Sequence, residues 1–310
     1  MYKPVAIILL NWNTPAHTLN CIASLQKFCN QFLFNIIVAD NGSSDGSLTL
    51  IRTQYPNLTY IDNKENLGFA EGNNRGLIYS INQGYAYSLV LNTDTEVDED
   101  IVLKLSTHLN QHTTVAAVQP AIFWMHKRSI IWNGEGCFNK LLGTTSSNTK
   151  KPALINVDDF KNAEWLTGCC MMIRNSALIK SGMFNKNFFL YFEDVELSFR
   201  LRSFGYQLHY LPSCKMYHEA GVSAKVNAPK KEGFLSPVIH YYISRNHLWF
   251  LRKYGNAFLY PLNIIYNGFY YGFLWGYFKI RSRNEKGKFL LKGLKEGFFT
   301  PKNLIWPDNH

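Results

Sequence analysis

The 310-residue sequence lacks the signatures of several common protein classes. Neither G-x-G-x-x-G nor G-x-x-x-x-G-K-[ST] follows the first apolar run, which excludes the dinucleotide fingerprint and the P-loop. The six cysteines contain no C-x-x-C pair, and no zinc-finger spacing occurs. No stretch interleaves basic and aromatic residues as single-strand binders do, so we expect no nucleic-acid partner.

The cysteines and the first residues bear on the compartment. Cys169 and Cys170 are adjacent in an apolar run, where opposite strand faces disfavour a bond between them. We interpret all six cysteines as reduced and mostly buried, which is typical of a cytosolic chain. The first residues lead straight into an apolar strand without a signal-peptide pattern, so we expect a cytoplasmic protein.

Aromatic residues and positive charge are both plentiful. Aromatic content is 15% and the formal net charge is +10. Such basicity favours nucleic acid, anionic lipid or a phosphorylated substrate as a partner. A chain of this length can bury a large core, as one elaborated α/β domain or as one domain plus an appendage.

The N-terminal half alternates apolar runs with helical patterns. Strands are expected at residues 5–10, 34–39 and 58–61, with helices near 19–26 and from 47 onward. Continuous apolar runs are typical of strands that are buried on both faces. The βαβαβ order predicts a parallel sheet, whose ligands lie beyond the carboxyl ends of the strands.

An acidic turn, Asn92-Thr93-Asp94-Thr95-Glu96, follows a buried apolar run at residues 87–91. An Asp at this place can hold a hard divalent cation and leave coordination positions for phosphate oxygens. Residues 97–100 are expected to open a helix, so the alternative is a helix cap within a solvated acidic turn.

Two other polar residues are candidates for nucleotide contacts. Asp40 ends the second strand, where its carboxylate can accept a hydrogen bond from a base or a ribose; an Asx-turn is the alternative. Residues 65–76 are expected to be a glycine-rich loop that approaches a ligand closely. Its Arg75 could pair with a diphosphate, or it is simply an exposed arginine before an ordinary helix.

Glu193 and Asp194 stand between bulky apolar residues at the expected start of a helix that stops at Gly205. This setting predicts an aromatic-lined site that contains a carboxylate with a fixed direction. Alternatively, the two acids complement the helix dipole. Residues 121–163 are expected to hold strands or loops around a variable insertion, with a mobile stretch at 144–151.

The C-terminal region suits a membrane surface. No charged residue occurs from Tyr254 to Phe278, a length that could span a bilayer, although proline and asparagine interrupt it. Polar residues at 256, 260, 263 and 267 share one helix face, which favours a helix lying in the interface, with a re-entrant hairpin or a packed helix as alternatives. The basic residues that follow favour anionic headgroups, or form a solvated face; they are Lys279, Arg281, Arg283, Lys286, Lys288, Lys292 and Lys295.

Four segments resemble family 2 glycosyltransferases, especially the bacterial rhamnosyltransferase-like branch. In chain order they lie at 11–13, 38–46, 66–76 and 91–95. The resemblance implies an α/β GT-A fold, with a mostly parallel Rossmann-like sheet flanked by helices. The catalytic domain would cover 1–235, with a nucleotide-sugar-binding half at 1–118 and an acceptor-binding half at 119–235. A helical membrane-associating region would cover 236–310.

The same resemblance implies roles for single residues. Asn92-Thr93-Asp94 resembles the family's DxD motif with Asn in the first position, so Asp94 would hold Mg²⁺ or Mn²⁺. His218 matches a metal ligand of some relatives, and Asp194 matches the general base. The implied donor-binding residues are Asn11, Asp40, Asn66, Arg75 and Asn92. The acceptor side would contain Trp165, Glu193 and Arg245, although Arg245 could instead be solvated on an amphipathic helix.

The resemblance therefore implies an inverting glycosyltransferase that takes a sugar, rhamnose by this branch, from a dTDP- or UDP-sugar. The acceptor would be a hydroxyl of a lipid-linked or growing cell-surface glycan at the inner face of the membrane, where the enzyme would bind peripherally. The rival is a non-catalytic nucleotide-binding or membrane-scaffold protein on the same fold, which the Asn at position 92 favours.

Overall fold

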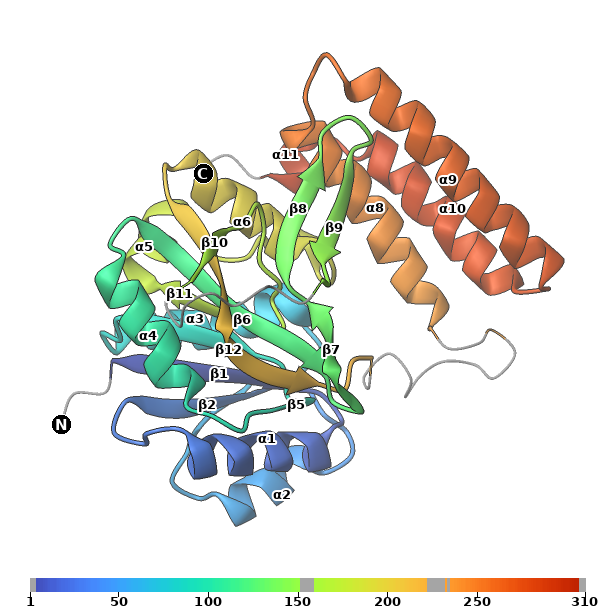
Figure 1. Ribbon diagram of the computed structural model, residues 1–310. Helices are drawn as coiled ribbons and strands as arrows, with labels where there is room; N and C mark the ends of the chain where they lie inside the picture. Colours follow the sequence, from blue (N-terminus) through green and yellow to red (C-terminus); the bar gives the residue numbers. More distant parts are fainter. Residues whose placement is uncertain (1–3, 151–158, 222–231, 233–234, 307–310) are drawn as a thin grey trace.

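The central strands of the fold are the apolar runs of the N-terminal half (Figure 1). This computed structural model describes residues 4–150, 159–221, 232 and 235–306. The strands β1 (Val5–Asn11), β2 (Phe34–Asp40), β3 (Thr59–Asp62) and β4 (Tyr87–Leu91) pair in parallel, in the order β4-β1-β2-β3. This arrangement confirms the expected parallel core.

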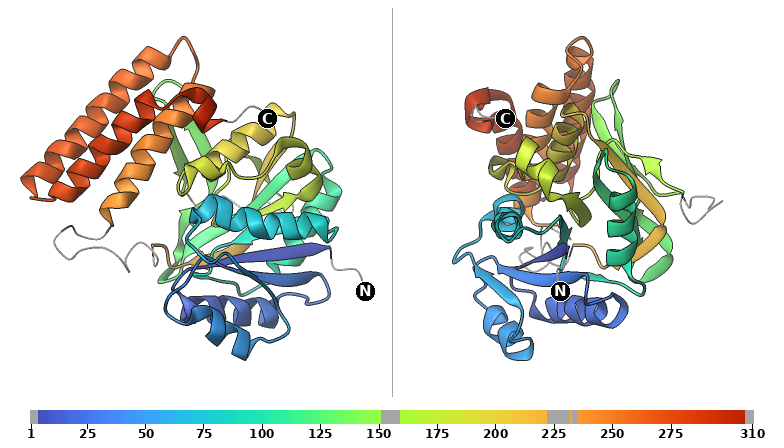
Figure 2. Two further views of the ribbon diagram at one scale, coloured as in Figure 1. Left: turned by 180° about the vertical axis from the view of Figure 1, so that it is seen from behind. Right: turned by 90° about the vertical axis from the view of Figure 1, so that its left-hand side faces the viewer.

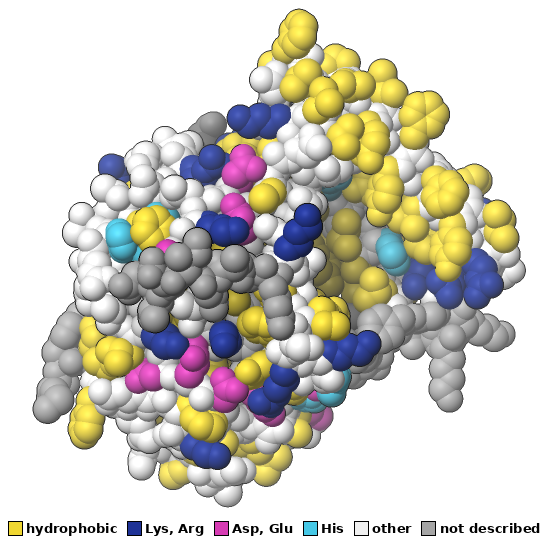
Figure 3. All heavy atoms as spheres, viewed as in Figure 1, with side chains coloured by type: hydrophobic (Ala, Val, Ile, Leu, Met, Phe, Trp, Pro, Cys, Tyr) yellow, Lys and Arg dark blue, Asp and Glu magenta, His cyan; other side chains and the backbone are white. Residues whose placement is uncertain are grey.

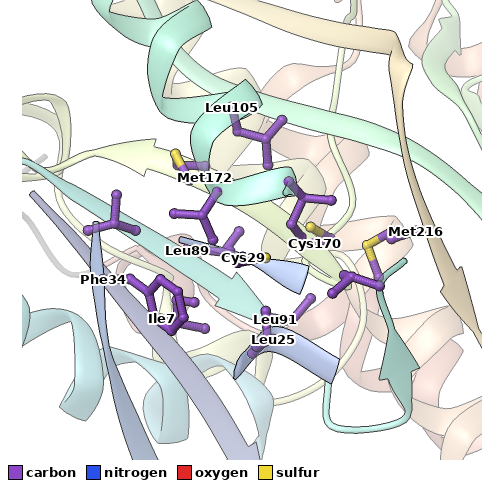
Figure 4. Close-up of a cluster of buried hydrophobic side chains, with 14 of the residues drawn as sticks. Ile7, Leu25, Cys29, Phe34, Leu89, Leu91, Leu105, Cys170, Met172 and Met216 are labelled. Atoms are coloured by element: carbon purple, nitrogen blue, oxygen red, sulfur yellow. The ribbon is translucent and has the colours of Figure 1, made fainter. Parts of the chain in front are cut away.

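Helices cover both faces of this sheet. One face packs α1 (Pro15–Phe28), α2 (Ser47–Gln54) and α4 (Ile101–Gln111). The other face packs α3 (Gly68–Asn82), α5 (Asn175–Ser181) and α6 (Glu193–Ser203), as the rear view in Figure 2 shows for α3. Figure 4 shows the first interface, where side chains of β1, β4 and β11 (Cys170–Arg174) meet Leu25 of α1, Cys29 directly after that helix, and Leu105 of α4.

The expected glycine-rich loop at residues 65–76 was largely wrong, because α3 already begins at Gly68. The glycines let this helix lie directly on β1. A Cβ at Gly72 would stand 2.7 Å from Leu10, and one at Gly76 would stand 2.5 Å from Ile8. The next helix was also placed too early: α4 starts at Ile101, and Asp100 caps it by accepting a 2.8 Å bond from the Leu103 amide.

The sheet continues into the second half of the chain with mixed pairing. Its path is β10-β12-β6-β11-β4-β1-β2-β3, and the short strand β5 (Thr95–Glu96) pairs with β12. The strand β11 (Cys170–Arg174) runs antiparallel to both neighbours, β4 and β6 (Val115–Trp124). Because β12 (Gln207–His218) lies parallel to β6, its last residues return to the edge at which β4 ends.

The hard-to-read region from 121 to 163 consists mainly of strands. β7 (Lys127–Asn133) extends the sheet at β6, and β10 (Lys161–Asn162) is an edge strand. The strands β8 (Glu135–Asn139) and β9 (Thr144–Asn148) form a separate hairpin, so most of the expected mobile stretch is a paired strand. All six cysteines are free and all but Cys137 are buried, which agrees with the reduced state expected for them.

The C-terminal region consists of α8 (Pro237–Tyr254), α9 (Tyr260–Ile280), α10 (Asn284–Phe299) and the short α11 (Lys302–Ile305). The first three lie together beside the sheet, next to the β8–β9 hairpin (Figure 1). In the described part of the chain, no helix has the length and apolar character needed to cross a membrane.

The polar stripe was expected to mark a helix that lies in the membrane interface; its members Asn263 and Asn267 are buried against the protein, as in the alternative of a packed helix. Asn263 donates hydrogen bonds to the carbonyls of Lys140 and Leu141, at 3.1 and 2.7 Å, and Asn267 donates to the Leu142 carbonyl at 2.8 Å. These carbonyls belong to the turn between β8 and β9. The stripe is buried because the turn supplies acceptors for it, and the apolar side of α9 is left outward.

Candidate active site

A cleft with a volume of about 370 Å³ opens at the carboxyl ends of β1 and β4. Loops from both halves of the chain line it, and α8 closes one side. The residues that line the cleft include Trp12, Asn41, Asn66, Gly68, Asn92, Asp94, Trp132, Thr167, Gly168, Phe189, Tyr191, Glu193, Asp194, His218 and Ile239.

Asp94 and His218 meet at this cleft from distant parts of the sequence. The pairing of β5 with β12 sets Thr95 opposite His218, and the Asp94 Oδ1 lies 3.0 Å from the His218 Nε2. Burial acts to raise the pKa of Asp94, but the hydrogen bond and charge interaction with His218 outweigh burial and lower it below its ordinary value. Asp94 is therefore an ionised carboxylate at neutral pH.

This pair is chemically suited to a divalent cation. Mg²⁺ and Mn²⁺ are commonly held by one or two protein ligands while substrate phosphates and water complete the shell. The His218 Nδ1 is buried without a hydrogen-bond partner among the described residues, and the Trp132 ring packs edge-on against the imidazole at 4.3 Å. Within those residues, no cluster of three or more His, Cys, Asp or Glu side chains forms a complete protein cage. The site fits a metal shared with a diphosphate.

Glu193 and Asp194 form the second charged feature of the cleft. Asp194 accepts a 2.9 Å bond from the Gly168 amide at Oδ2, which fixes the direction of its carboxylate. Burial raises the pKa of Asp194, against the bonds donated by the Gly168 and Val195 amides. Burial and the neighbouring Asp194 charge raise the pKa of Glu193 much further, and its Oε2 has no partner among the described residues. The pair therefore favours a protonated Glu193 beside an ionisable Asp194.

Of the expected donor-binding residues, Asn66 and Asn92 line the cleft. Asn11 and Asp40 do not belong to the described lining. Asp40 is only 2% exposed, and its carboxylate accepts bonds from Asn11 Nδ2 at 2.7 Å and from the Ser43 amide and hydroxyl at 2.9 and 2.7 Å. The structure thus supports the turn-forming alternative for Asp40, and a contact with a nucleobase stays a prediction.

Three other expected site residues lie outside the lining. Arg75 is half exposed and pairs with Glu71 at 3.1 Å, as the alternative interpretation had it. Trp165 donates to the Cys137 carbonyl at 3.1 Å and packs beside Phe138. Arg245 is buried rather than solvated, because its guanidinium bonds to backbone carbonyls.

Sequence reasoning missed several residues that shape the site. Asn41 donates to Asn66 Oδ1 at 3.0 Å and accepts from the Leu67 amide at 3.1 Å, so it orders the loop that carries Asn66. Its position directly after Asp40, inside a segment already singled out, was an available signal. No signal in the sequence pointed to Trp132, because the pattern of residues 127–133 does not identify the strand β7 that carries it.

Comparison with known proteins agrees with this geometry. Residues 6–182, more than half of the chain, match the model of the glycosyl transferase family 2. The chain is 28% identical over 208 residues to the low-salt glycan biosynthesis hexosyltransferase Agl10 of Haloferax volcanii, covering 65% of this chain and 62% of that protein. It is 23% identical over 236 residues to an N-acetylglucosaminyl-diphospho-decaprenol L-rhamnosyltransferase of Mycobacterium tuberculosis, covering 70% of this chain and 76% of that protein.

Solved structures show the same fold. The mannosyltransferase PcManGT of Pyrobaculum calidifontis, in complex with GDP-Man and Mn²⁺, superposes with a TM-score of 0.56 at 12% identity, over 96% of this chain and 88% of that one. GalNAc-T7 with UDP, GalNAc and Mn²⁺ gives a TM-score of 0.61 at 13% identity, over 86% and 54%. The fold is the expected α/β GT-A fold with a C-terminal helical region. The chain belongs to glycosyl transferase family 2.

Proposed function

We propose that the protein is an inverting, metal-dependent glycosyltransferase that moves a sugar from a nucleotide-sugar to a hydroxyl of a lipid-linked or growing cell-surface glycan. The observation that carries this proposal is the composition of one cleft. It is lined both by the Asp94–His218 pair, which suits a metal-bound diphosphate, and by a partly buried carboxylate, Asp194, which suits proton removal.

Asp194 is the general base of the proposed reaction. It takes the proton of the acceptor hydroxyl as that oxygen attacks the anomeric carbon, while the bond to the nucleoside diphosphate breaks on the opposite face. A raised pKa makes a carboxylate a better proton acceptor, and the Gly168 amide holds its second oxygen. Direct displacement of this kind inverts the anomeric configuration.

Glu193 supplies a complementary group. As a neutral carboxyl it can donate a hydrogen bond, and Glu193 is one of the residues that line the cleft, where a sugar hydroxyl could accept that bond. Asp94 and His218 would hold Mg²⁺ or Mn²⁺, which when bound supplies positive charge to the departing diphosphate. Asn66 and Asn92 offer amide groups to the donor from the same cleft.

The donor is proposed to be a dTDP- or UDP-sugar, with rhamnose as the favoured sugar. Support comes from the relatives, which include the mycobacterial rhamnosyltransferase and the rhamnosyltransferase WbbL of Escherichia coli, 26% identical over 199 residues.

The outward face of α9 supports peripheral attachment to the inner face of the membrane. Bulky apolar side chains cover it, among them Phe269 at 77% exposure and Phe273 at 80% (Figure 3). Soluble proteins rarely expose a contiguous apolar surface of this kind without a partner for it. The last turn of α9 adds the exposed Lys279 and the turn after it adds the exposed Arg281, each of which contributes about 1 kcal/mol near an anionic surface.

One of the expected headgroup contacts is corrected by the structure. Lys286 is 3% exposed and lies over the Phe278 ring, so it cannot take part in a surface interaction. The exposed lysines at 288, 292 and 295 continue the basic side of α10. A membrane-bound enzyme would meet a lipid-linked acceptor without having to extract it from the bilayer.

The test is a transfer assay with the full chain on liposomes that carry a polyprenyl-diphosphate-linked sugar. A panel of dTDP-, UDP- and GDP-sugars is supplied with Mg²⁺ or Mn²⁺, and the product's anomeric configuration is determined by NMR. Transfer with inversion that a chelator abolishes would support the proposal. Nucleotide binding without transfer or donor hydrolysis across the panel would instead favour the non-catalytic nucleotide-binding protein.

A further inference from the structure

The segment that leads into α6 has a strained backbone. Phe189, Tyr191 and Phe192 have φ angles of 62°, 67° and 67°, in a region that bulky L-residues rarely adopt. Phe192 directly precedes α6, so its conformation sets the direction in which Glu193 and Asp194 leave the helix start. Such conformations persist only when the surroundings hold them.

Two neighbouring residues of α8 hold this segment by its carbonyl groups. The Asn246 side-chain amide donates to the carbonyls of Phe188 at 2.8 Å, Leu190 at 2.9 Å and Tyr191 at 2.7 Å. Asn246 is fully buried. The Arg245 guanidinium binds the Phe188 carbonyl as well, at 3.1 Å, and we call these contacts the carbonyl clamp.

Arg245 also orients its neighbour. Its Nε donates a 2.9 Å bond to the Asn246 Oδ1, which turns the Asn246 amide nitrogen toward the segment, and its Nη2 reaches the Asn187 carbonyl at 2.9 Å. Exchanging the two ends of the Asn246 amide would set an oxygen against three carbonyls. The orientation of the Asn246 amide is therefore fixed by hydrogen bonds at its oxygen and at its nitrogen.

The carbonyl of Phe189 connects the segment to the first turn of α3, next to Asn66. Phe189 presents its carbonyl to the amides of Phe69, at 2.7 Å, and Ala70, at 3.2 Å, in the first turn of α3. Gly68, at the start of that turn, has no space for a side chain, because a Cβ there would stand 2.5 Å from the same carbonyl. The strained segment thus joins the turn beside Asn66 to the Glu193–Asp194 pair.

We propose that Asn246, oriented by Arg245, is a positioning residue for the Glu193–Asp194 pair. The carbonyl clamp stabilises the strained turn, and the turn aims both carboxyl groups into the cleft. Asn246 is not among the described residues that line the cleft, so it acts through the backbone and not on the substrate. This inference rests on the proposed function, in which Asp194 is the base.

The experiment compares two Asn→Leu variants of the full chain. Asn246→Leu keeps the side-chain size and removes the three bonds to the strained turn. Asn263→Leu is the matched control, since it removes amide-to-carbonyl bonds of the same kind, to Lys140 and Leu141, at the β8–β9 turn outside the cleft. Hydrogen–deuterium exchange over residues 187–196, binding of UDP and dTDP, and kcat and KM for transfer are measured below both melting temperatures.

We expect Asn246→Leu to raise exchange over residues 187–192 and to lower kcat by on the order of tenfold to a hundredfold, since a shift of about 1 Å at reacting groups can cost 10²-fold. Nucleotide binding and the donor KM should stay within about threefold of the wild-type values, because the Asp94–His218 pair is untouched. Asn263→Leu should have a lower melting temperature than the wild type, while its hydrogen–deuterium exchange over residues 187–192 and its kcat should equal the wild-type values.

Unchanged exchange over this segment in Asn246→Leu, or equal losses of kcat in both variants, would overturn the proposal. If Asn246→Leu does not fold, Arg245→Lys serves instead, because lysine keeps the charge but loses the bond that orients Asn246; it should give the same pattern in weaker form. If the wild type transfers no sugar from any donor, the proposed function fails, and the exchange measurement alone decides whether the clamp holds the turn.

Discussion

Replacing Asp194 by Asn should abolish transfer and at the same time make the protein's stability, relative to wild type, rise with pH. The amide has the size of the carboxyl, and its oxygen can still accept the 2.9 Å bond from the Gly168 amide, although the 2.8 Å bond from the Val195 amide is lost at every pH. What it cannot do is accept the proton of the acceptor hydroxyl. Loss of a general base typically costs 10²–10⁴ in rate, or about 3–5 kcal/mol of activation free energy.

This relative gain in stability with pH follows from the raised pKa of Asp194. Burial lifts the folded-state pKa above its ordinary value of 3.8, so the folded protein holds its proton to a higher pH than the unfolded chain does. Folding stability is therefore lost as pH rises from the unfolded pKa through the folded one. Each pH unit between the two values corresponds to about 1.4 kcal/mol that the Asn variant does not lose.

The assay combines single-turnover transfer with urea denaturation between pH 4 and pH 8. The difference in free energy of unfolding between the variant and the wild type should move in favour of the variant as pH rises from 4 to 8. Asp62→Asn is the control, since this partly exposed carboxylate pairs with Lys64 and its pKa is lowered. Near wild-type turnover in Asp194→Asn would remove the residue from the mechanism, and a stability difference that does not change between pH 4 and pH 8 would refute the burial argument.

Three other predictions concern the metal, the membrane and the core. Asp94→Ala should weaken UDP or dTDP binding in the presence of Mn²⁺ by calorimetry, and full activity of the wild type in excess chelator would contradict a metal role. The pair Phe269→Ser and Phe273→Ser should reduce flotation with anionic liposomes while leaving the melting temperature unchanged; equal flotation would assign α9 another partner. Arg200→Leu should destabilise the fold by about 3–5 kcal/mol in denaturant titrations, because it breaks the buried ion pair with Glu196 at 2.8 Å and leaves that carboxylate only the Tyr254 hydroxyl at 2.8 Å and Lys253 at 3.7 Å; a loss below about 1 kcal/mol would show that these two partners suffice.

The sequence allowed the parallel core to be predicted because a strand buried on both faces has an unmistakable composition. The runs that became β1, β2 and β4 are continuous apolar segments. The positions of Asp94 and Asp194 followed from the same logic, because each stands where a strand or helix pattern begins or ends. Local sequence contains that information.

What could not be predicted depended on partners distant in the chain. A strand-end carboxylate such as Asp40 can point into a ligand site or back into its own turn, and Asn11 and Ser43 decide this. Helical spacing likewise shows that Asn263 and Asn267 share a face, but not that the β8–β9 turn offers carbonyls to it. The glycines of α3 resemble a loop until β1 is seen lying against them.

The outward face of α9 has a consequence for how the protein behaves in the laboratory. The side chains on it contribute nothing to the core, so the folded molecule, rather than an unfolded intermediate, is the species that adheres to other molecules. Self-association in plain buffer should therefore grow with concentration without any loss of secondary structure. Mild detergent or a lipid nanodisc should disperse the particles, and conditions chosen only to raise the melting temperature should not.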